Sequence, residues 1–218
     1  MSRREPRAAV VVMAKSPQPG RVKTRLCPPC TPAEAATLAA AALADTLAAV
    51  EALPQIRPVV ALDGPVGPWL PRAFDVVPQV AGDLGTRLAA ATTTVGGPML
   101  VVGMDTPQLD TALLDNAMRA LLAPGVDAVL GPATDGGYWA IGLDSPTGCE
   151  FDDVPMSTDH TGAAQLARLS ALGLRVGSLT VQRDVDTFAD ALAVAVAAPA
   201  TRFAAAVRAL AVAVAVPA

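Results

Sequence analysis

Four cationic side chains follow the first apolar run of this 218-residue chain, in the segment VVVMAKSPQPGRVKTRL. Lys15, Arg21, Lys23 and Arg25 lie on a stretch that also holds Gly20 and two prolines. Ligands of α/β proteins collect at the carboxyl ends of parallel strands, where a cationic loop is suited to phosphates. A solvated surface run would explain the charge, but not the glycine and prolines that shape the backbone. We therefore predict a phosphate-binding loop for a nucleotide.

Three aspartates are candidate metal ligands. Asp105 ends the apolar run PMLVVGMD, so we expect its side chain at the edge of the sheet, and Asp184 or Asp186 would supply a second carboxylate. Mg²⁺ prefers one or two carboxylates together with phosphate oxygens and water. The alternatives are that Asp105 caps the helix after Pro107, and that Asp184 and Asp186 form a turn and N-cap ahead of a helix near Thr187. Spacing alone leaves both alternatives open.

Two glycine-containing segments are further candidates. The segment Gly82-Asp83-Leu84-Gly85 opens a predicted helix, whose first amides could meet a base edge or a phosphate, or could form an ordinary N-cap. The segment Asp135-Gly136-Gly137-Tyr138 is either part of a pocket or a simple hairpin turn. Tyr138 and Trp139 point to opposite faces of a strand, so one of them is a candidate pocket residue. The lone histidine, His160, is a candidate acid or base, or a helix surface residue.

The sequence alternates between strand and helix patterns, which predicts a mostly parallel sheet with helices on both faces. This fold would position the candidate residues. Thr31-Pro32-Ala33-Glu34 reads as a capping box that starts a helix running to about Ala52. Further helices are predicted from the GDLG segment, after Asp105 with Leu109 on its apolar face, and over 157–172. The predicted strands are 8–13, 57–63, a run from Phe74, 98–105, and the runs DAVLGP, GYWAIGL and LRVGSLT.

Composition bounds the class of protein. With 52% hydrophobic residues and no linker, residues 1–218 are expected to form one domain, ending in a core-packing or dimerising helix over about 201–218. A net charge of −4 and 3% aromatic residues argue against binding of nucleic acid. The C-terminal apolar segment is interrupted by Arg208 and is too short for a membrane span. The N-terminal apolar run has only the minimum length for a signal peptide and lacks a small-residue cleavage site, so we predict a strand there. The isolated pair Cys27 and Cys30 lacks the partners of a zinc site and fits a reducing cytoplasm.

Six motifs occur in an order that carries a resemblance: AKSPQPGRVKTRL, GDLGTRL, GMDTPQL, GPATDGGYWAIGL, PMSTDHTGAAQL and RDVDTFADAL. From Ala8 to about Leu192 the chain resembles the transferase family associated with radical-SAM and selenodomain proteins, a branch of the nucleotide-diphospho-sugar transferase superfamily. The segments Lys23-Thr24-Arg25-Leu26 and Asp184-Val185-Asp186-Thr187 are more distantly similar to the phospholactate guanylyltransferases and the molybdenum-cofactor nucleotidyltransferases.

The resemblance implies a GT-A-like, Rossmann-type three-layer α/β sandwich and a site of three parts. The catalytic residues would be Lys23, Arg25 and Asp105. Asp105, Asp186 and Asp184 would hold Mg²⁺ (or Mn²⁺). The nucleotide and its phosphates would be bound by Ala14, Lys15, Gly20, Lys23, Thr24, Arg25, Gly82, Asp83 and Gly85. The acceptor side would comprise Asp135, Gly136, Gly137, Tyr138 and Ser157.

Two departures from the resembled pattern bear on the reaction. Met156 stands where the family usually has tryptophan, and Gly103-Met104-Asp105 offers one carboxylate where the superfamily's glycosyltransferases commonly carry Asp-x-Asp. The second departure favours nucleotidyl transfer, in which a small acceptor attacks the α-phosphate of a nucleoside triphosphate and pyrophosphate leaves. The alternatives are glycosyl transfer from a nucleotide-diphospho-sugar, and a nucleotide-sensing module without catalysis.

Overall fold

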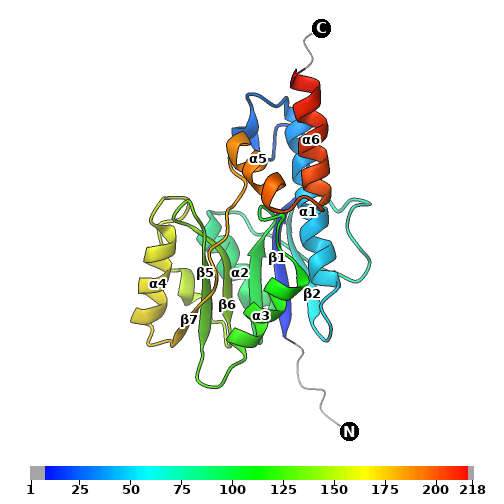
Figure 1. Ribbon diagram of the computed structural model, residues 1–218. Helices are drawn as coiled ribbons and strands as arrows, with labels where there is room; N and C mark the ends of the chain where they lie inside the picture. Colours follow the sequence, from blue (N-terminus) through cyan, green and yellow to red (C-terminus); the bar gives the residue numbers. More distant parts are fainter. Residues whose placement is uncertain (1–7, 216–218) are drawn as a thin grey trace.

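A seven-stranded sheet forms the centre of the molecule, and helices cover both of its faces (Figure 1). The computed structural model describes residues 8–215. Six strands run in one direction and β6 runs against them, in the order β3-β2-β1-β4-β6-β5-β7. The predicted mostly parallel α/β class is thereby confirmed. The strands are β1 (Ala9–Lys15), β2 (Arg57–Asp63), β3 (Asp75–Pro78), β4 (Met99–Gly103), β5 (Ala128–Pro132), β6 (Tyr138–Leu143) and β7 (Val176–Ser178).

The alternation of side chains along β1 builds two cores. Val10 and Val12 face the layer that contains α1 (Pro32–Glu51) and α3 (Thr111–Leu121), whereas Val11 faces the layer of α2 (Leu84–Val95) and α4 (Thr161–Ala171). Because both faces of the strand are covered, its residues are apolar without interruption from Ala9 to Ala14. Three consecutive valines therefore specify a central strand and not an exposed one.

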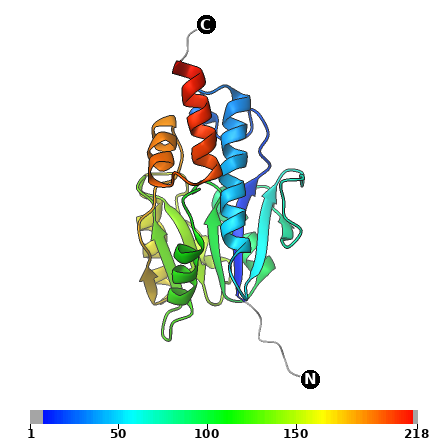
Figure 2. The ribbon, with the colours of Figure 1, turned by 45° about the vertical axis from the view of Figure 1, so that its right-hand side comes forward.

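A third core lies beyond the carboxyl ends of β1 and β4. The helices α5 (Phe188–Ala197) and α6 (Arg202–Ala215) pack there, with α6 side by side with the first half of α1 (Figure 2). Leu26, from the short helix η1 (Thr24–Leu26), and Val185 are buried in the same cluster. The hydrophobic packing thus brings the basic loop beside the acidic segment 184–186, although about 160 residues of sequence separate them.

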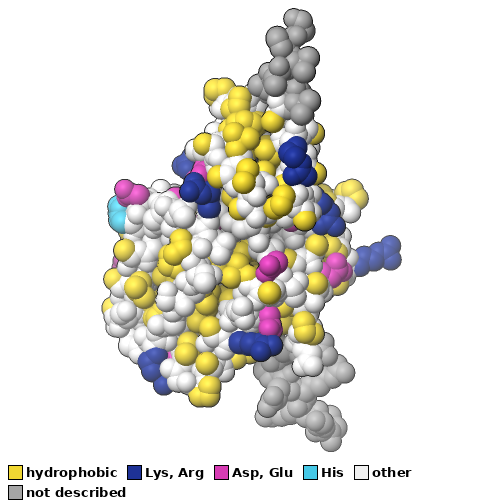
Figure 3. Space-filling model, in the orientation of Figure 1, with side chains coloured by type: hydrophobic (Ala, Val, Ile, Leu, Met, Phe, Trp, Pro, Cys, Tyr) yellow, Lys and Arg dark blue, Asp and Glu magenta, His cyan; other side chains and the backbone are white. Residues whose placement is uncertain are grey.

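Hydrophobic side chains remain on the outer surface of this third core (Figure 3). Val196 on α5 is 81% exposed, and Leu192 of the same helix is also exposed. The predicted terminal helix is present as α6, and residues 216–218 lie outside the described part. Dimerisation through this terminal helix stays a prediction.

Capping residues set the helix boundaries. Thr31 and Glu34 form the predicted capping box of α1. Asp110 accepts from the amide of Leu113, so α3 begins at Thr111 and the predicted helical position Leu109 lies before it. The helix predicted from Ser157 begins at Thr161, because the preceding residues form a turn in which the Thr161 hydroxyl bonds the amide of Thr158.

By length and composition, one helix in the described residues, α1, could cross a membrane. More than half of its apolar window is buried, against the sheet and α6. A core helix passes the same length test, so the apolar character of α1 is explained by its packing.

Candidate active site

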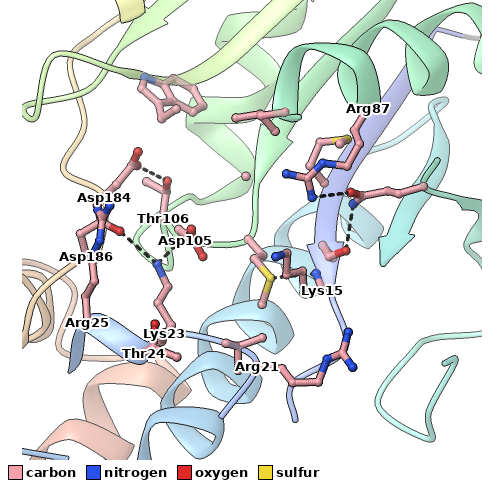
Figure 4. Close-up of a pocket in the computed structure, with 18 of the residues that line it drawn as sticks. Lys15, Arg21, Lys23, Thr24, Arg25, Arg87, Asp105, Thr106, Asp184 and Asp186 are labelled. Carbon is pink, nitrogen blue, oxygen red and sulfur yellow. Dashed lines mark hydrogen bonds and ion pairs between the residues drawn. The ribbon is translucent and has the colours of Figure 1, made fainter. Parts of the chain in front are cut away.

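A cavity of about 450 Å³ opens at the carboxyl ends of β1 and β4, bordered by η1 and by the segment that leads into α5 (Figure 4). Five cationic and three carboxylate side chains line it, which gives the lining a net formal charge of +2. The cations are Lys15, Arg21, Lys23, Arg25 and Arg87, and the carboxylates are Asp105, Asp184 and Asp186. The predicted basic loop and the predicted metal ligands therefore share one cavity.

The Lys23 ammonium lies within the acidic end of the cavity. Its Nζ is 2.9 Å from Asp105 Oδ2 and 3.7 Å from Asp186 Oδ1, and it donates a hydrogen bond to the carbonyl of Val185. Arg25 Nη1 pairs with the other oxygen of Asp186 at 2.9 Å. Two of the five lining cations are thus already neutralised by carboxylates.

Backbone and side-chain bonds hold the two acidic segments together. The amide of Val185 donates to the carbonyl of Asp105 at 3.0 Å, and Thr106 Oγ1 donates to Asp184 Oδ1 at 2.7 Å. Burial raises the pKa of Asp184 to about 6, and the nearby Asp105 acts in the same direction. The Thr106 hydrogen bond opposes this shift, because it favours the charged carboxylate.

The capping alternatives for these aspartates are wrong. The N-cap of α3 is Asp110, which leaves the carboxylate of Asp105 free to face Lys23. The N-cap of α5 is Thr187, in a capping box with Asp190, so neither Asp184 nor Asp186 caps that helix. The side chains of all three predicted metal ligands line the cavity.

The opposite end of the cavity is cationic and lies near the start of α2. Gln79 donates to the carbonyls of Ala14 and Ala61, at 3.0 and 2.8 Å, and its Oε1 accepts from Arg87 Nη1 at 3.2 Å. Arg87 Nε also donates to the carbonyl of Asp83. These neutral contacts fix the guanidinium, and no carboxylate of the described residues lies within 4.0 Å of it. These hydrogen bonds therefore fix the position of the Arg87 side chain, and its remaining N–H groups can donate to a ligand.

Lys15 and Arg21 complete this end. Lys15 Nζ lies 3.7 Å from Asp63 Oδ2, a long and exposed contact. Arg21 makes no ion pair with the carboxylates that the structure describes and is exposed. The positive charge that the carboxylates of the cavity do not neutralise is therefore carried by Arg21, Arg87 and the weakly paired Lys15.

The remaining predicted nucleotide-binding residues divide between two places. Ala14 and Thr24 line the main cavity, whereas Gly20 lies in the turn before Arg21. Asp83 and Gly85 line a separate cavity of about 290 Å³ beside Asp152 and Asp153. Asp83 accepts from the amide of Thr86 and so caps α2, which confirms the capping interpretation of the Gly82–Gly85 segment. A nucleotide role for Gly82, Asp83 and Gly85 stays a prediction.

The turn Asp135-Gly136-Gly137, predicted for the acceptor side, joins β5 and β6. It is therefore a hairpin turn, which is the simpler of the two interpretations of this segment. Tyr138 lines the cavity, and its hydroxyl lies 3.3 Å from Gln165 Oε1, in a setting where burial raises the pKa of the phenol. Trp139 also lines the cavity, with its indole N–H bound to the carbonyl of Thr180. The turn is held against α4 because the amide of Gly162 donates to the carbonyl of Gly136 at 2.8 Å.

Two other candidates, Ser157 and His160, and the substituted position Met156 do not line the main cavity. Ser157 adopts a positive φ of 62° in the turn before α4. Met156, which replaces the tryptophan of the resembled family, contacts the Tyr138 hydroxyl through its sulfur at 3.9 Å. His160 is exposed, is the N-cap of α4 and pairs with its neighbour Asp159. The structure therefore places His160 on the surface, as the alternative interpretation has it.

Sequence reasoning missed three polar residues of the cavity: Gln79, Arg87 and Thr106. Gln79 follows the short strand β3, and its position depends on strand register. Arg87 follows the cap residue Asp83 by four positions, so the helical period could have placed it one turn inside α2. Thr106 directly follows Asp105 and could have been found as its neighbour.

The acidic end of the cavity fits a divalent cation by its donor chemistry. Asp105 and Asp186 approach the same point from two chain segments, and both contact one cation, the Lys23 ammonium. Carboxylate oxygens are the donors that Mg²⁺ and Mn²⁺ take from proteins, usually one or two per ion. No group of three or more such ligands is present in the described residues, so phosphate oxygens and water would complete the coordination.

The architecture and the cavity at its carboxyl edge define a protein with the fold of nucleotide-diphospho-sugar transferases. The chain is similar to a proposed nucleotide-diphospho-sugar transferase from Desulfovibrio desulfuricans G20, with 25% identity, a TM-score of 0.78, and 87% of each chain covered. The chain belongs to the family described as an uncharacterized protein conserved in bacteria (DUF2064), which matches residues 36–158. A comparison with curated proteins found no match.

Two further structures share the fold at lower identity. One is CMP:2-keto-3-deoxy-manno-octonic acid synthetase complexed with CTP, with 12% identity, a TM-score of 0.54, and 84% of this chain and 94% of that chain covered. The other is a cytidylyltransferase from Leptospira borgpetersenii serovar Hardjo-bovis, with 12% identity, a TM-score of 0.52, and 83% and 79% covered.

Proposed function

We propose that the chain is a metal-dependent transferase that binds a nucleotide in the main cavity and catalyses nucleotidyl transfer to a small acceptor. The observation that carries this proposal is the meeting of the basic loop with Asp105 and Asp186 in one cavity of net positive charge. We also propose that the chain belongs to the transferase branch associated with radical-SAM proteins and that it is located in the cytoplasm.

In the proposed reaction, an oxygen of the acceptor forms a bond to the α-phosphorus of a nucleoside triphosphate. The bond from that phosphorus to the bridging oxygen breaks, and pyrophosphate leaves with the electron pair; a hydroxyl acceptor also loses its proton to solvent or base. Such chemistry depends mainly on positioning and on neutralising phosphate charge. A bound Mg²⁺ would supply charge neutralisation and polarise a phosphate oxygen.

The chain's own residues divide this work. Lys15, together with Arg21 and Arg87, would attract the polyphosphate, since their charge is largely uncompensated. Lys23 and Arg25 would contact the β- and γ-phosphates after exchanging their carboxylate partners for phosphate oxygens. Asp105 and Asp186 would hold the metal.

Pyrophosphate release tests the proposal. The full chain would be incubated with each nucleoside triphosphate, Mg²⁺ and a panel of phosphorylated and hydroxylated small acceptors. We expect acceptor-dependent pyrophosphate release with one nucleotide preferred. Tight nucleotide binding without turnover across the panel would instead favour a nucleotide-sensing module.

Glycosyl transfer is a second candidate, because the similar protein from Desulfovibrio desulfuricans is a proposed nucleotide-diphospho-sugar transferase. Calorimetric titration distinguishes the two functions. A nucleotidyltransferase should bind one of GTP, CTP, UTP or ATP more tightly than the corresponding diphosphate, whereas a glycosyltransferase should prefer UDP- or GDP-sugars.

A further inference from the structure

The ammonium of Lys23 is enclosed by oxygen atoms from two chain segments. Its three oxygen contacts are Asp105 Oδ2, Asp186 Oδ1 and the carbonyl of Val185. The side chain is only 10% exposed, against 70% for Arg25 in the same loop. Lys23 is therefore the innermost cation of the acidic end, whereas Arg25 contacts Asp186 from outside.

These oxygens are the same ones that a divalent cation would use. Asp105 and Asp186 are the carboxylates that approach one point, and both contact Lys23 in this arrangement, while the second oxygen of Asp186 pairs with Arg25. An ammonium and a divalent cation a few ångströms apart repel each other in a partly buried site. Binding of the one at these carboxylates must therefore disfavour the other.

The backbone at Lys23 adopts an uncommon conformation. Its φ of 50° and ψ of 38° lie in the left-handed region, which disfavours residues with a Cβ. No side-chain hydrogen bond caps the helix η1 that follows it. The contacts of the ammonium with Asp105, Asp186 and Val185 are made by the side chain of a residue in this rare backbone conformation.

We propose that Lys23 is an internal counter-cation that makes metal binding depend on the nucleotide. A polyphosphate attracted by Arg21 and Arg87 draws the Lys23 ammonium away from Asp105 and Asp186, and these carboxylates then accept a divalent cation. The inference rests on the proposed function for the identity of the polyphosphate. Competition between Lys23 and the metal, however, is a property of the protein alone and can be measured without nucleotide.

Mn²⁺ binding to the full chain tests the competition directly. Free Mn²⁺ would be measured by electron paramagnetic resonance, in the absence of nucleotide, for the wild type and for Lys23→Met, which removes the charge and keeps an unbranched side chain that is one atom shorter. Removing a unit charge in contact with the carboxylates should tighten Mn²⁺ binding by about tenfold or more. Lys23→Met with no gain in affinity, or with weaker binding, would overturn the proposal.

Lys15→Met is the matched control. Lys15 lines the same cavity, but its ammonium pairs with Asp63 and not with the acidic end. Its replacement should change Mn²⁺ affinity by no more than about twofold, because the charge lies beyond the contact range of Asp105 and Asp186. An equal gain in both variants would overturn the proposal, since it would reflect net charge alone. Adding Asp105→Asn to Lys23→Met should abolish the gain.

A second readout measures the coupling to nucleotide. Linkage requires that Mn²⁺ tighten nucleotide binding by the same factor as nucleotide tightens Mn²⁺ binding. The ratio of nucleotide affinities in saturating Mn²⁺ and in EDTA should be large for the wild type, and should fall by about tenfold or more in Lys23→Met. Should Lys23→Met fold poorly by circular dichroism, Lys23→Gln replaces it, because glutamine is neutral and can donate to Val185.

The two proposals can fail separately. Tight Mn²⁺ binding by Lys23→Met, with no nucleotide bound by any variant, would support the competition between Lys23 and the metal but contradict both its coupling to nucleotide and the proposed function. Nucleotide-dependent turnover by the wild type, with unchanged Mn²⁺ affinity in Lys23→Met, would do the reverse.

Discussion

Thr106 Oγ1 donates a hydrogen bond of 2.7 Å to Asp184 Oδ1, and this contact joins the end of β4 to the segment that leads into α5. Thr106 is 1% exposed, so the hydroxyl cannot be replaced by water without rearrangement. The same two segments are joined by the backbone bond from Val185 to Asp105. One buried hydroxyl and one amide thus help to fix the register of the acidic end, together with the hydrogen bond from Gln108 Nε2 to the carbonyl of Arg183.

Thr106→Val should destabilise the protein, because a buried carboxylate loses its donor. We expect the free energy of unfolding to fall by about 1–3 kcal/mol at pH 7, measured by urea denaturation. Thr106→Ser keeps the hydroxyl and should recover most of this loss. Equal stability of the valine variant and the wild type would show that the bond to Asp184 contributes nothing.

Asp105→Asn should abolish the metal-dependent reaction. The amide keeps the shape of the side chain but removes the charge that would hold the ion, so turnover should fall by about 100-fold or more. Nucleotide binding in EDTA should persist, because the cations of the cavity remain. Asp115→Asn, on the outer side of α3 where Asp115 pairs with Arg119, is the matched control and should keep full activity. Unchanged turnover in Asp105→Asn would refute the metal role of Asp105.

Much of the fold could be predicted from local patterns. The three valines of β1 and the Thr31–Glu34 capping box each specify their element through near neighbours, and the structure confirms both. Asp105 was correctly placed at the edge of the sheet, because the carboxyl ends of parallel strands meet there. The start of α3 was predicted too early, since Leu109 continues the apolar spacing although Asp110 is the residue that caps the helix.

The partners within the cavity could not be predicted in the same way. The pairing of Lys23 with Asp105 joins residues from two separate chain segments, and nothing in either local segment encodes it. The hydrogen bond from Arg87 to Gln79 likewise requires the register of β3 against β2. Local sequence identified the charged groups, whereas tertiary packing decided which of them neutralise one another.

Arg87→Met should weaken nucleotide binding more than it weakens the fold. The guanidinium is held by neutral partners and faces the cavity without a carboxylate among the described residues, so its loss removes a favourable field for phosphates or a carbonyl of the base. A charge-assisted hydrogen bond contributes about 1.5–3 kcal/mol, which predicts about a 10- to 100-fold loss of affinity in titration calorimetry. Arg119→Met on α3 serves as the surface control. Equal affinity of wild type and Arg87→Met would remove Arg87 from the site.

Gly136→Ala should be severely destabilising. A Cβ at this position would lie 1.8 Å from the carbonyl oxygen of Asp159, and φ is +88°. Gly173 has a similar φ of +75° but nothing within 4 Å of its Cβ position, so Gly173→Ala isolates the backbone cost. We expect a loss of about 1 kcal/mol for Gly173→Ala and several times that for Gly136→Ala, by thermal or urea unfolding. Similar losses in both would mean that the contact between this turn and Asp159 yields easily.

The ion pair between Asp127 and Arg175 lies away from the cavity and should make the stability of the protein depend on pH. Arg175 Nε and Nη2 donate to the two carboxylate oxygens of Asp127 at 2.8 and 2.9 Å, and the Arg175 amide donates as well, which holds the pKa of Asp127 well below its usual range. A carboxyl with a lowered pKa in the folded state stabilises above the pKa of the unfolded state, and this stabilisation is lost as pH falls through the lower folded value. Asp127→Asn should therefore melt below the wild type at pH 7, and the gap should narrow as pH is lowered below about 4. Melting curves from pH 7 to the lowest pH at which both proteins fold would check this. A difference in melting temperature that widens in acid would contradict it, because the native state would then prefer the neutral carboxyl.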